Sequence, residues 1–506
     1  MRLPLLCPKF IRRPHIHGFH WAGIIFIFGV NGALASFLTL RISITADPRM
    51  VLQPWLLNQG FIPYLHIADE HSPLLPHLLA GLQTLVHNDG ILALRLAHAS
   101  TLTLLFGLVS GWLWMRYGIW AAVAGISFIW AFAVRFGITT FWYNLALAPL
   151  FFGFFILLSI FSSEQRHLWR VALSGLLVGI GVLLKQQAIV LIPVFLIWLV
   201  LMHWKRYLDW RSIPKALLLF IAGVIVPVIL YLAFYLSHGG SLTALVEWTL
   251  LFNLTSGYAR LGFLLPSHFD LIAIWPAFLL AVPFIASLWM PGTLTTQERL
   301  LRLWLAICTV SSLIFLYPRY SPPHWAAAFG FIAAMSAIVS ADIIKTGAVL
   351  PSVAYLLRTL AITFLIFWGA YGTFLLWPGI AGISQPKLLK FDEQRELAEL
   401  LKTALPSESS LVFVPDNEAV SNVYYILQKT PPKFWMMHYP WFMQPHIREQ
   451  WLAELGKNPP DFVVWIEGLQ DLSATGPEIE PFIFERYAEV NHFFWQGHTI
   501  RLLQRR

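Results

Sequence analysis

The amino-acid sequence predicts a polytopic α-helical membrane protein with a small α/β domain at its C-terminal end. Of the 506 residues, 58% are hydrophobic and only 12% are charged, and the mean hydropathy is +0.66. A soluble domain has about 25% charged residues, so the deficit indicates a chain that lies largely in lipid. Apolar runs of membrane length recur up to about residue 380, after which the composition is that of a soluble domain.

About eleven segments are predicted to cross the membrane, because each approaches the roughly 20 apolar residues that a spanning helix needs. They are 20–40, 93–114, 118–134, 141–161, 171–184, 188–203, 216–237, 270–290, 303–317, 322–342 and 359–378. The shortest of them are tolerable if they pack inside a bundle or line a cavity. The 23 Trp and 15 Tyr fit aromatic belts at the two membrane interfaces.

The basic residues between these spans predict the orientation. If the N-terminal tail is cytoplasmic, the loops on that side carry most of the Lys and Arg, as the positive-inside rule requires. These residues are Arg116, Arg166, Arg170, Lys205, Arg206, Arg211, Lys215, Arg299, Arg302, Lys345 and Arg358. An odd number of spans then places the C-terminal domain outside the cytoplasm. The net charge of +8 is therefore a topology signal, and no nucleic-acid partner is expected.

Residues 381–506 are predicted to form the extracytoplasmic α/β domain. FDEQRELAELLKTAL, EAVSNVYYILQK and HIREQWLAEL are predicted helices, with apolar residues at helical spacing clearest in the first. LVFVPD and DFVVWIE are predicted buried strands, and HFFWQGHTIRLLQRR is predicted to be a hairpin or an edge strand. Residues 1–380 then form the membrane domain, with a first outer loop at 41–92.

The first outer loop is the predicted floor of an active site, because it is long and unusually polar for this chain. Residues 46–87 combine acids, histidines and prolines between two apolar runs. Ionisable groups near membrane depth are costly and are commonly paired or functional. The uncommon polar groups that the predicted topology brings to this face are Asp47, Asp69, Glu70, His71, Lys185, Gln186, Arg319 and Tyr320.

This combination of acids and cations favours chemistry on a phosphate-linked substrate. Lys185 and Arg319 would neutralise a phosphate, and Asp47 would act as a general base. Alternatively, the carboxylates would hold a divalent metal ion, and the spacing does not choose between these roles. Structural roles are open as well: a helix cap for Asp47, a snorkelling side chain for Lys185 and an interfacial anchor for Arg319.

Nucleotide sites of the common types are disfavoured. GxxxxGK[ST] is absent, and no GxGxxG follows a predicted strand.

The order of these motifs resembles that of GT-C type membrane glycosyltransferases. The chain resembles the superfamily of dolichyl-phosphate-mannose protein mannosyltransferases and aminoarabinose transferases, that is, proteins similar to glycosyltransferase family 39. NQGFIPYLHIADEHSPLLPHLLAGLQ resembles the family's first-loop pattern of Tyr, Asp and Pro-Pro-Leu, and ILALRLAHA resembles the helix that follows. LLKQQA resembles its lysine-containing turn, and YPRYSPPHWAAAFGFIAA resembles its late Arg-Tyr segment.

The resemblance implies a GT-C-like fold and an enzyme that moves a hexosyl or pentosyl group, with inversion, from a polyprenyl-phosphate donor. The acceptor would be a lipid, a glycan or a protein outside the cytoplasm. Asp47 would be the base or would orient the acceptor. The implied substrate contacts are Tyr64, Asp69, Glu70, His71, Asn144, Lys185, Gln186, Arg319 and Tyr320. No cofactor is firmly implied, and a divalent metal ion stays an open alternative.

Two positions depart from the family pattern. Pro48 follows Asp47 where the family often has Glu, and Asn144 stands at the second acidic position. Because an asparagine cannot act as a base and is a weaker metal ligand, a two-carboxylate metal site is disfavoured.

The alternative functions are a transporter or flippase for a lipid-linked sugar and a membrane scaffold whose tail binds partners. No internal repeat is visible in the sequence, which disfavours transport.

Overall fold

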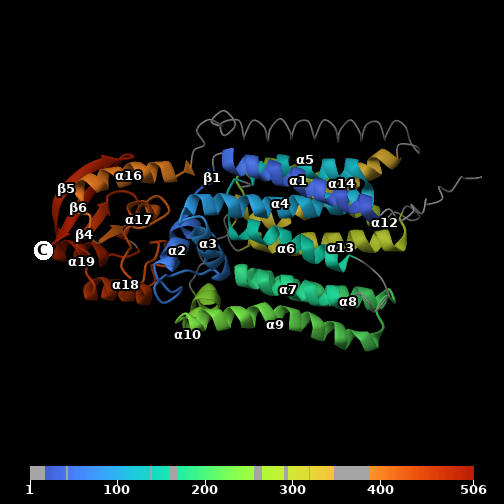
Figure 1. The fold of residues 1–506 in the computed structure, drawn as a ribbon, viewed down its shortest axis with the longest axis horizontal. Coiled ribbons are helices and arrows are strands. Elements are labelled where there is room, and N and C mark those ends of the chain that lie inside the picture. The colour runs from blue at the N-terminus through green and yellow to red at the C-terminus, as the bar shows by residue number, and fades with distance from the viewer. Residues whose placement is uncertain are drawn as a thin grey trace, which may run out of the picture.

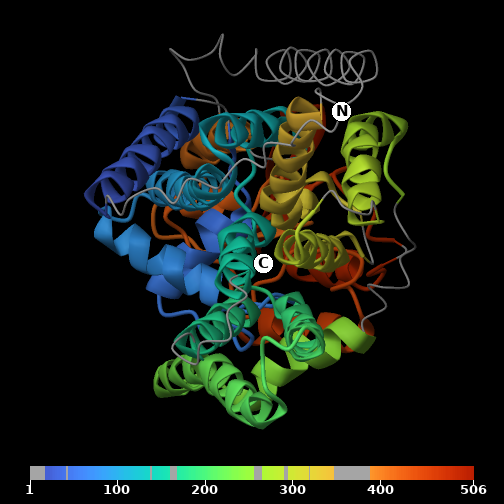
Figure 2. The same cartoon turned by 90° about the vertical axis from the view of Figure 1, so that its right-hand side faces the viewer.

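A computed structural model gives the fold and describes most of the chain. The described residues are 17–41, 44–136, 139–159, 168–255, 265–289, 294–317, 320–346, 388–473 and 475–506. A long helical bundle carries the C-terminal domain at one end, with α2 (Pro48–Asn58) and α3 (Leu74–Leu85) between the two (Figure 1). Figure 2 views the bundle from the end opposite that domain.

Ten of the eleven predicted spans coincide with helical segments, and the span at 359–378 lies outside the described residues. The bundle helices are α1 (His17–Arg41), α4 (Gly90–Tyr117), α5 (Ile119–Arg135), α6 (Tyr143–Leu158), α7 (Leu168–Leu184), η2 (Gln186–Val190) with α8 (Leu191–Trp204), α9 (Ile213–Ser237), α12 (His268–Trp289), α13 (Thr296–Ser312), and η7 (Pro322–Ala328) with α14 (Phe329–Thr346). Five helical segments of the described chain are long and apolar enough to cross a membrane, and further apolar helices are shorter.

Glycines allow α7 and α9 to pack with their backbones in close contact. A Cβ at Gly175 would lie 2.2 Å from the carbonyl oxygen of Phe220, and one at Gly223 would lie 2.2 Å from that of Ala172. Gly179 is equally tight, so α7 presents a Gly-x-x-x-Gly face of the kind that brings membrane helices together. This contact fixes the end of α7 that precedes Lys185.

Several basic residues predicted for loops lie inside helices, and Arg302 is also buried. Arg302, predicted to be a cytoplasmic loop residue, is inside α13 and only 2% exposed. Its guanidinium donates to the Asp342 carboxylate at 2.5 and 3.0 Å and to Glu298 at 3.2 Å. The helix begins at Thr296, before the predicted span that starts at residue 303, because these charges neutralise one another and can be buried in the helix packing.

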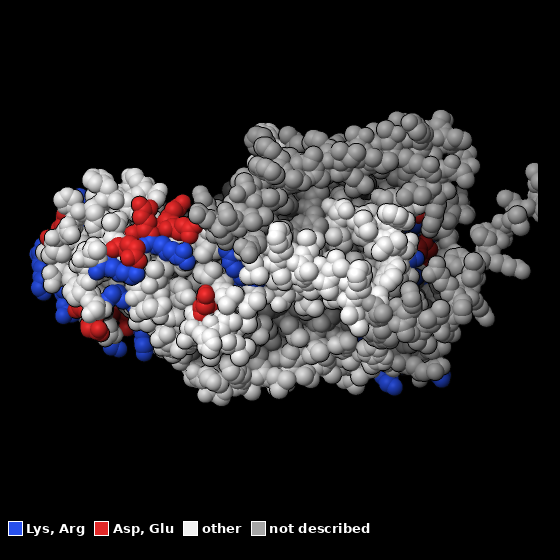
Figure 3. Space-filling model, turned by 45° about the horizontal axis from the view of Figure 1, so that its top comes forward, with Lys and Arg blue, Asp and Glu red and all other residues white. Residues whose placement is uncertain are grey.

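The C-terminal domain is a four-stranded sheet with strand order β3-β4-β6-β5, in which only the β3-β4 pair is parallel. Its strands are β3 (Leu411–Val414), β4 (Phe462–Ile466), β5 (Tyr487–Trp495) and β6 (His498–Arg505), and its helices are α16 (Phe391–Ala404), α17 (Asn422–Leu427), α18 (Pro445–Lys457) and α19 (Ile479–Arg486). The predicted α/β alternation is confirmed, and the last segment forms a hairpin. On the face drawn in Figure 3, charged side chains gather over this domain, whereas the described part of the bundle visible there is largely uncharged.

The first outer loop and the C-terminal domain share structure. Strand β1 (Ile44–Thr45) pairs in parallel with β2 (Leu388–Leu389), and the Asn422 amide donates to the carbonyl of Ala46 at 2.9 Å. One buried apolar cluster joins Leu52, Trp55 and Leu56 of α2 to Leu397 and Leu401 of α16. The loop is therefore a folded layer whose position depends on both neighbours.

Candidate functional site

Asp47 lies at the junction of these parts and caps α2. Its carboxylate accepts the backbone N–H of Arg49 at 2.9 Å, and Pro48 takes the first helical position, where a missing N–H costs nothing. This local chemistry explains why proline follows the acid. Burial raises the pKa of the Asp47 carboxyl to about 6, although the positive charge of Arg49 opposes the rise.

Arg49 is a site residue that the sequence reasoning missed. It is buried, and its Nη2 lies 3.5 Å from Glu70 Oε1. The guanidinium carbon lies 5.2 Å from the ring centre of Trp142 and 5.4 Å from that of Tyr439, which are cation–π distances. A signal was present, since a cation in the first turn of a helix opposes the helix dipole and needs another reason to be there.

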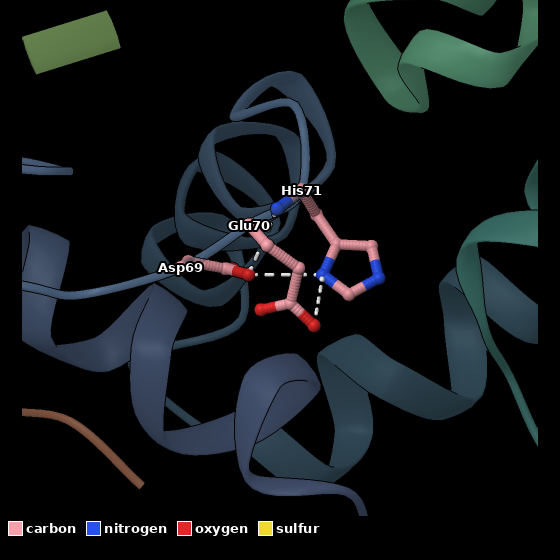
Figure 4. Close-up of side chains that lie close together, drawn as sticks. All are labelled: Asp69, Glu70 and His71. Atoms are coloured by element: carbon pink, nitrogen blue, oxygen red, sulfur yellow. Dashed lines mark hydrogen bonds and ion pairs between the residues drawn. The ribbon is translucent and has the colours of Figure 1, made fainter. Parts of the chain in front are cut away.

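Asp69, Glu70 and His71 form a compact buried cluster (Figure 4). His71 Nδ1 lies 2.9 Å from Asp69 Oδ1 and 3.6 Å from Glu70 Oε1. The other Asp69 oxygen accepts the Gln53 amide at 2.9 Å. Burial alone would raise the pKa of Asp69, but the charge and hydrogen bond of His71, together with Arg49 and Gln53, lower it to about 2. Asp69 is therefore ionised at neutral pH.

Three predicted or neighbouring side chains hold the main chain of this cluster. The Tyr64 hydroxyl donates to the carbonyl of His71 at 2.6 Å. The Gln186 and Asn253 amides both donate to the carbonyl of Glu70, at 2.7 and 2.9 Å. Tyr64 and Gln186 thus orient the acidic turn through its backbone, which is a positioning contribution.

Lys185 and Asn144 meet beside this cluster. The buried Lys185 ammonium donates to the Asn144 side-chain oxygen at 2.7 Å. The position at which the resembled family has its second acid therefore contacts the lysine, and the neutral asparagine forms a hydrogen bond with it and not an ion pair. Helix η2, which follows Lys185, is held by Gln187, whose amide donates to the carbonyl of Tyr317 at 3.2 Å.

The two remaining predicted contacts have different outcomes. Arg319 lies outside the described residues. Tyr320 is 8% exposed and packs in the apolar core of the bundle at the start of η7. Its chain neighbour Tyr317 touches the turn after Lys185, so this segment borders the cluster.

Several polar atoms of the cluster are buried without a hydrogen-bond partner among the described residues. They are Glu70 Oε2, Gln53 Oε1, Tyr143 OH and Asn144 Nδ2. The Tyr143 ring stacks on His71, with centroids 4.3 Å apart and planes 4° from parallel. Each such atom costs about 1–3 kcal/mol unless something else satisfies it. Their convergence is typical of a site for a polar ligand.

Sequence reasoning also missed the residues that surround the cluster. Trp142 and Tyr143 directly precede Asn144, so a wider window around that position would have included them. Gln53 is one turn along α2 from Arg49, on the same buried face. Tyr439 comes from the C-terminal domain, and the sequence contains no signal for its approach.

The donor set of two carboxylates and an imidazole is one that binds transition metals, but its arrangement does not fit a resident ion. His71 Nδ1 and Asp69 Oδ1 are 2.9 Å apart, and because Asp69 is ionised, the imidazole carries the shared proton. Arg49 already places a positive charge 3.5 Å from Glu70. The three side chains therefore form a hydrogen-bonded cluster, and Arg49 supplies the cation that a metal ion would otherwise provide.

We expect metal ions to leave the folded protein unaffected. Because His71 Nδ1 and Asp69 Oδ1 are bonded to each other and Glu70 Oε1 faces Arg49, neither EDTA treatment nor added Mn²⁺ or Zn²⁺ should shift the thermal unfolding temperature of the purified protein. An increase of several degrees with a micromolar metal, lost in Glu70→Gln, would contradict this prediction.

No protein-family model and no curated protein matches the chain by sequence. Solved structures do match it in three dimensions. ArnT from Cupriavidus metallidurans in the apo state superposes with a TM-score of 0.61 at 13% identity, covering 95% of this chain and 98% of that one. The same enzyme bound to undecaprenyl phosphate superposes with a TM-score of 0.60 at 13% identity and the same coverage. ArnT is a GT-C glycosyltransferase, an aminoarabinose transferase. The likeness extends over nearly the whole of both chains, and the chain has the GT-C fold.

Proposed function

We propose that this protein is an integral-membrane glycosyltransferase that moves a sugar from a polyprenyl-phosphate donor to an extracytoplasmic acceptor. The observation that carries the proposal is that the half-buried acid Asp47 begins the helix of the buried Arg49, and that the buried Lys185 lies near Arg49 and Glu70 at the same end of the bundle. The fold supports it, since the similar ArnT structure contains undecaprenyl phosphate.

The cations serve the leaving phosphate. Among the described residues, the Arg49 guanidinium makes one carboxylate contact, with Glu70 at 3.5 Å, and Lys185 donates to a neutral amide, so an anionic phosphate would supply each cation with a stronger partner. Charge-assisted hydrogen bonds to phosphate are among the strongest that side chains make. Arg319 is proposed as a third phosphate contact on the strength of its sequence motif.

Asp47 serves the acceptor. The acceptor oxygen or nitrogen forms a bond to the anomeric carbon while the bond from that carbon to the phosphate oxygen breaks. The electron pair leaves with the phosphate, and the acceptor's proton passes to the Asp47 carboxylate. Attack opposite to the leaving group inverts the anomeric centre.

The orientation follows from charge. Arg116 lies in the last turn of α4, and Lys205, Arg206 and Arg211 follow α8; both helices end away from the C-terminal domain. The positive-inside rule assigns that end to the cytoplasm, so the site and the C-terminal domain are proposed to face outward.

The direct test is mass analysis of envelope glycolipids and glycoproteins from cells with and without this protein. A sugar modification that disappears on deletion and returns with the wild-type gene identifies acceptor and sugar together. A flippase would instead change several products of one donor at once. An unchanged profile would contradict the proposal.

Transfer is expected to rise with pH through about pH 6. The Asp47 base must be ionised, and its pKa is raised by burial to about 6, so activity is lost as pH falls through that value. Asp69, with a pKa of about 2, stays ionised throughout. The measurement is the initial rate at saturating donor between pH 5 and pH 8, and a flat profile would contradict the assignment.

A further inference from the structure

The C-terminal domain contributes the ring of Tyr439 to the site. Arg49 lies between Trp142, which precedes α6 of the bundle, and Tyr439 of the C-terminal domain. The two aromatic contacts thus come from parts of the chain almost 300 residues apart in sequence. The guanidinium position depends on both, because each ring face attracts the same cation.

Tyr439 is itself held by charged groups of its own domain. Its hydroxyl donates to Glu418 Oε1 at 2.5 Å, and the other Glu418 oxygen accepts the Lys390 ammonium at 2.5 Å. The Tyr439 ring also stacks on Trp441, with centroids 4.5 Å apart. The Gln394 amide donates to the carbonyl of Glu418 at 2.7 Å, so α16 fixes the acid in turn.

The same domain holds the backbone on both sides of Asp47. Asn422 donates to the carbonyl of Ala46, and β2 pairs with β1 directly before it. The backbone N–H of Arg49 donates to the Asp47 carboxylate, and the Arg49 guanidinium lies over the Tyr439 ring. Both the acid and the cation of the proposed chemistry therefore rest on C-terminal groups.

We propose that the C-terminal domain completes the catalytic centre, with Tyr439 and the Glu418–Lys390 pair as positioning residues for Arg49 and Asp47. The catalytic role of these residues rests on the proposed function, whereas the contacts between them do not depend on it. It predicts that charges and rings more than 340 residues from Asp47 in sequence alter its ionisation and the binding of phosphate at Arg49.

The charged groups that act on Asp47 are Arg49 from its own helix and Glu418 and Lys390 from the C-terminal domain. Glu418 raises the pKa of Asp47, whereas Arg49 and Lys390 lower it. Glu418→Gln should therefore lower the pKa of Asp47, and Lys390→Met should raise it. An exposed pair of the same domain provides the control, Glu399→Gln, since Glu399 pairs with Lys402 on the surface.

The first experiment reads this ionisation through stability. The pKa of Asp47 is higher in the folded than in the unfolded chain, so its contribution to stability is full below about pH 4 and is lost as pH rises through about 6. The Asp47→Asn protein has no carboxyl at this position, so it does not lose this stability as pH rises. The difference in unfolding temperature between wild type and Asp47→Asn, measured on the full chain in nanodiscs, should decline over that range and level off near pH 6.

In the Glu418→Gln background the same difference should level off at a lower pH, and in the Lys390→Met background at a higher pH. In the Glu399→Gln background, the difference should level off at the same pH as without this substitution. Identical curves in all four backgrounds would overturn the role of the Glu418–Lys390 pair. This comparison requires no sugar transfer, so it decides the inference even if the proposed function fails.

The second experiment tests the ring. Undecaprenyl phosphate is titrated into the full chain, and binding is followed by native mass spectrometry with inorganic phosphate as the competitor. Tyr439→Leu should weaken binding roughly tenfold, whereas Tyr439→Phe, which keeps the ring, should stay within about twofold of wild type. Wild-type affinity in a folded Tyr439→Leu protein would overturn the role of the ring. If the wild type itself does not bind the lipid, the proposed donor class fails, and the pH comparison alone decides the inference.

Discussion

Replacing Asp47 with asparagine is expected to abolish sugar transfer while leaving the protein folded. Asparagine is as good an N-cap as aspartate, so the hydrogen bond from the Arg49 N–H and the start of α2 are retained. Its amide cannot accept the acceptor's proton, and loss of a general base costs about 10²–10⁴-fold in rate. The measurement is recovery of the envelope glycolipid profile in cells that carry only the variant.

The same loop offers a matched control. Asp89 caps α4 by accepting the N–H groups of Ile91 and Leu92, at 3.0 and 2.9 Å, and this carboxylate is exposed. Asp89→Asn therefore makes the same chemical change at the same kind of position and should transfer sugar at the wild-type rate. Retained transfer in Asp47→Asn, with equal membrane abundance of both variants, would contradict the role of Asp47 as base.

The helical bundle could be predicted from sequence because its determinants are local. A run of about 20 apolar residues has few alternatives to a spanning helix, and ten of the predicted segments form helical segments in the described chain. The strands of the C-terminal domain were predictable for a similar reason, since LVFV and FVVWI are short, β-branched and bounded by turns. Arg302 was misplaced because its partner Asp342 lies on another helix.

The site was predictable only in part. Asp69, Glu70 and His71 are adjacent in sequence, so their clustering required no tertiary knowledge. The contact between Lys185 and Asn144 joins two helices, and the sequence could propose each residue without pairing them. The Tyr439 ring reaches Arg49 through packing of the loop against a separate domain, and no local pattern reports such a contact.

Replacing Arg49 is expected to have the second large effect. Arg49→Met removes a buried cation that the leaving phosphate needs, and truncating one partner of a buried charge pair costs about 2–5 kcal/mol. Undecaprenyl phosphate affinity should fall by roughly 10²-fold or more. Arg49→Lys should not restore it, since a lysine ammonium cannot stack between two rings while also reaching Glu70. Arg395→Lys is the control, because that arginine lies over Phe391 on the exposed surface of α16.

Loss of Arg49 also leaves Glu70 buried without its cation, so a destabilised variant could lose binding for a trivial reason. The double variant Arg49→Met/Glu70→Gln separates the two causes, because the glutamine removes the unpaired charge. Its unfolding temperature should return toward that of wild type while lipid binding stays weak. If binding returns together with stability, Arg49 acts only by neutralising Glu70, and the leaving phosphate must be held by Lys185 and its neighbours.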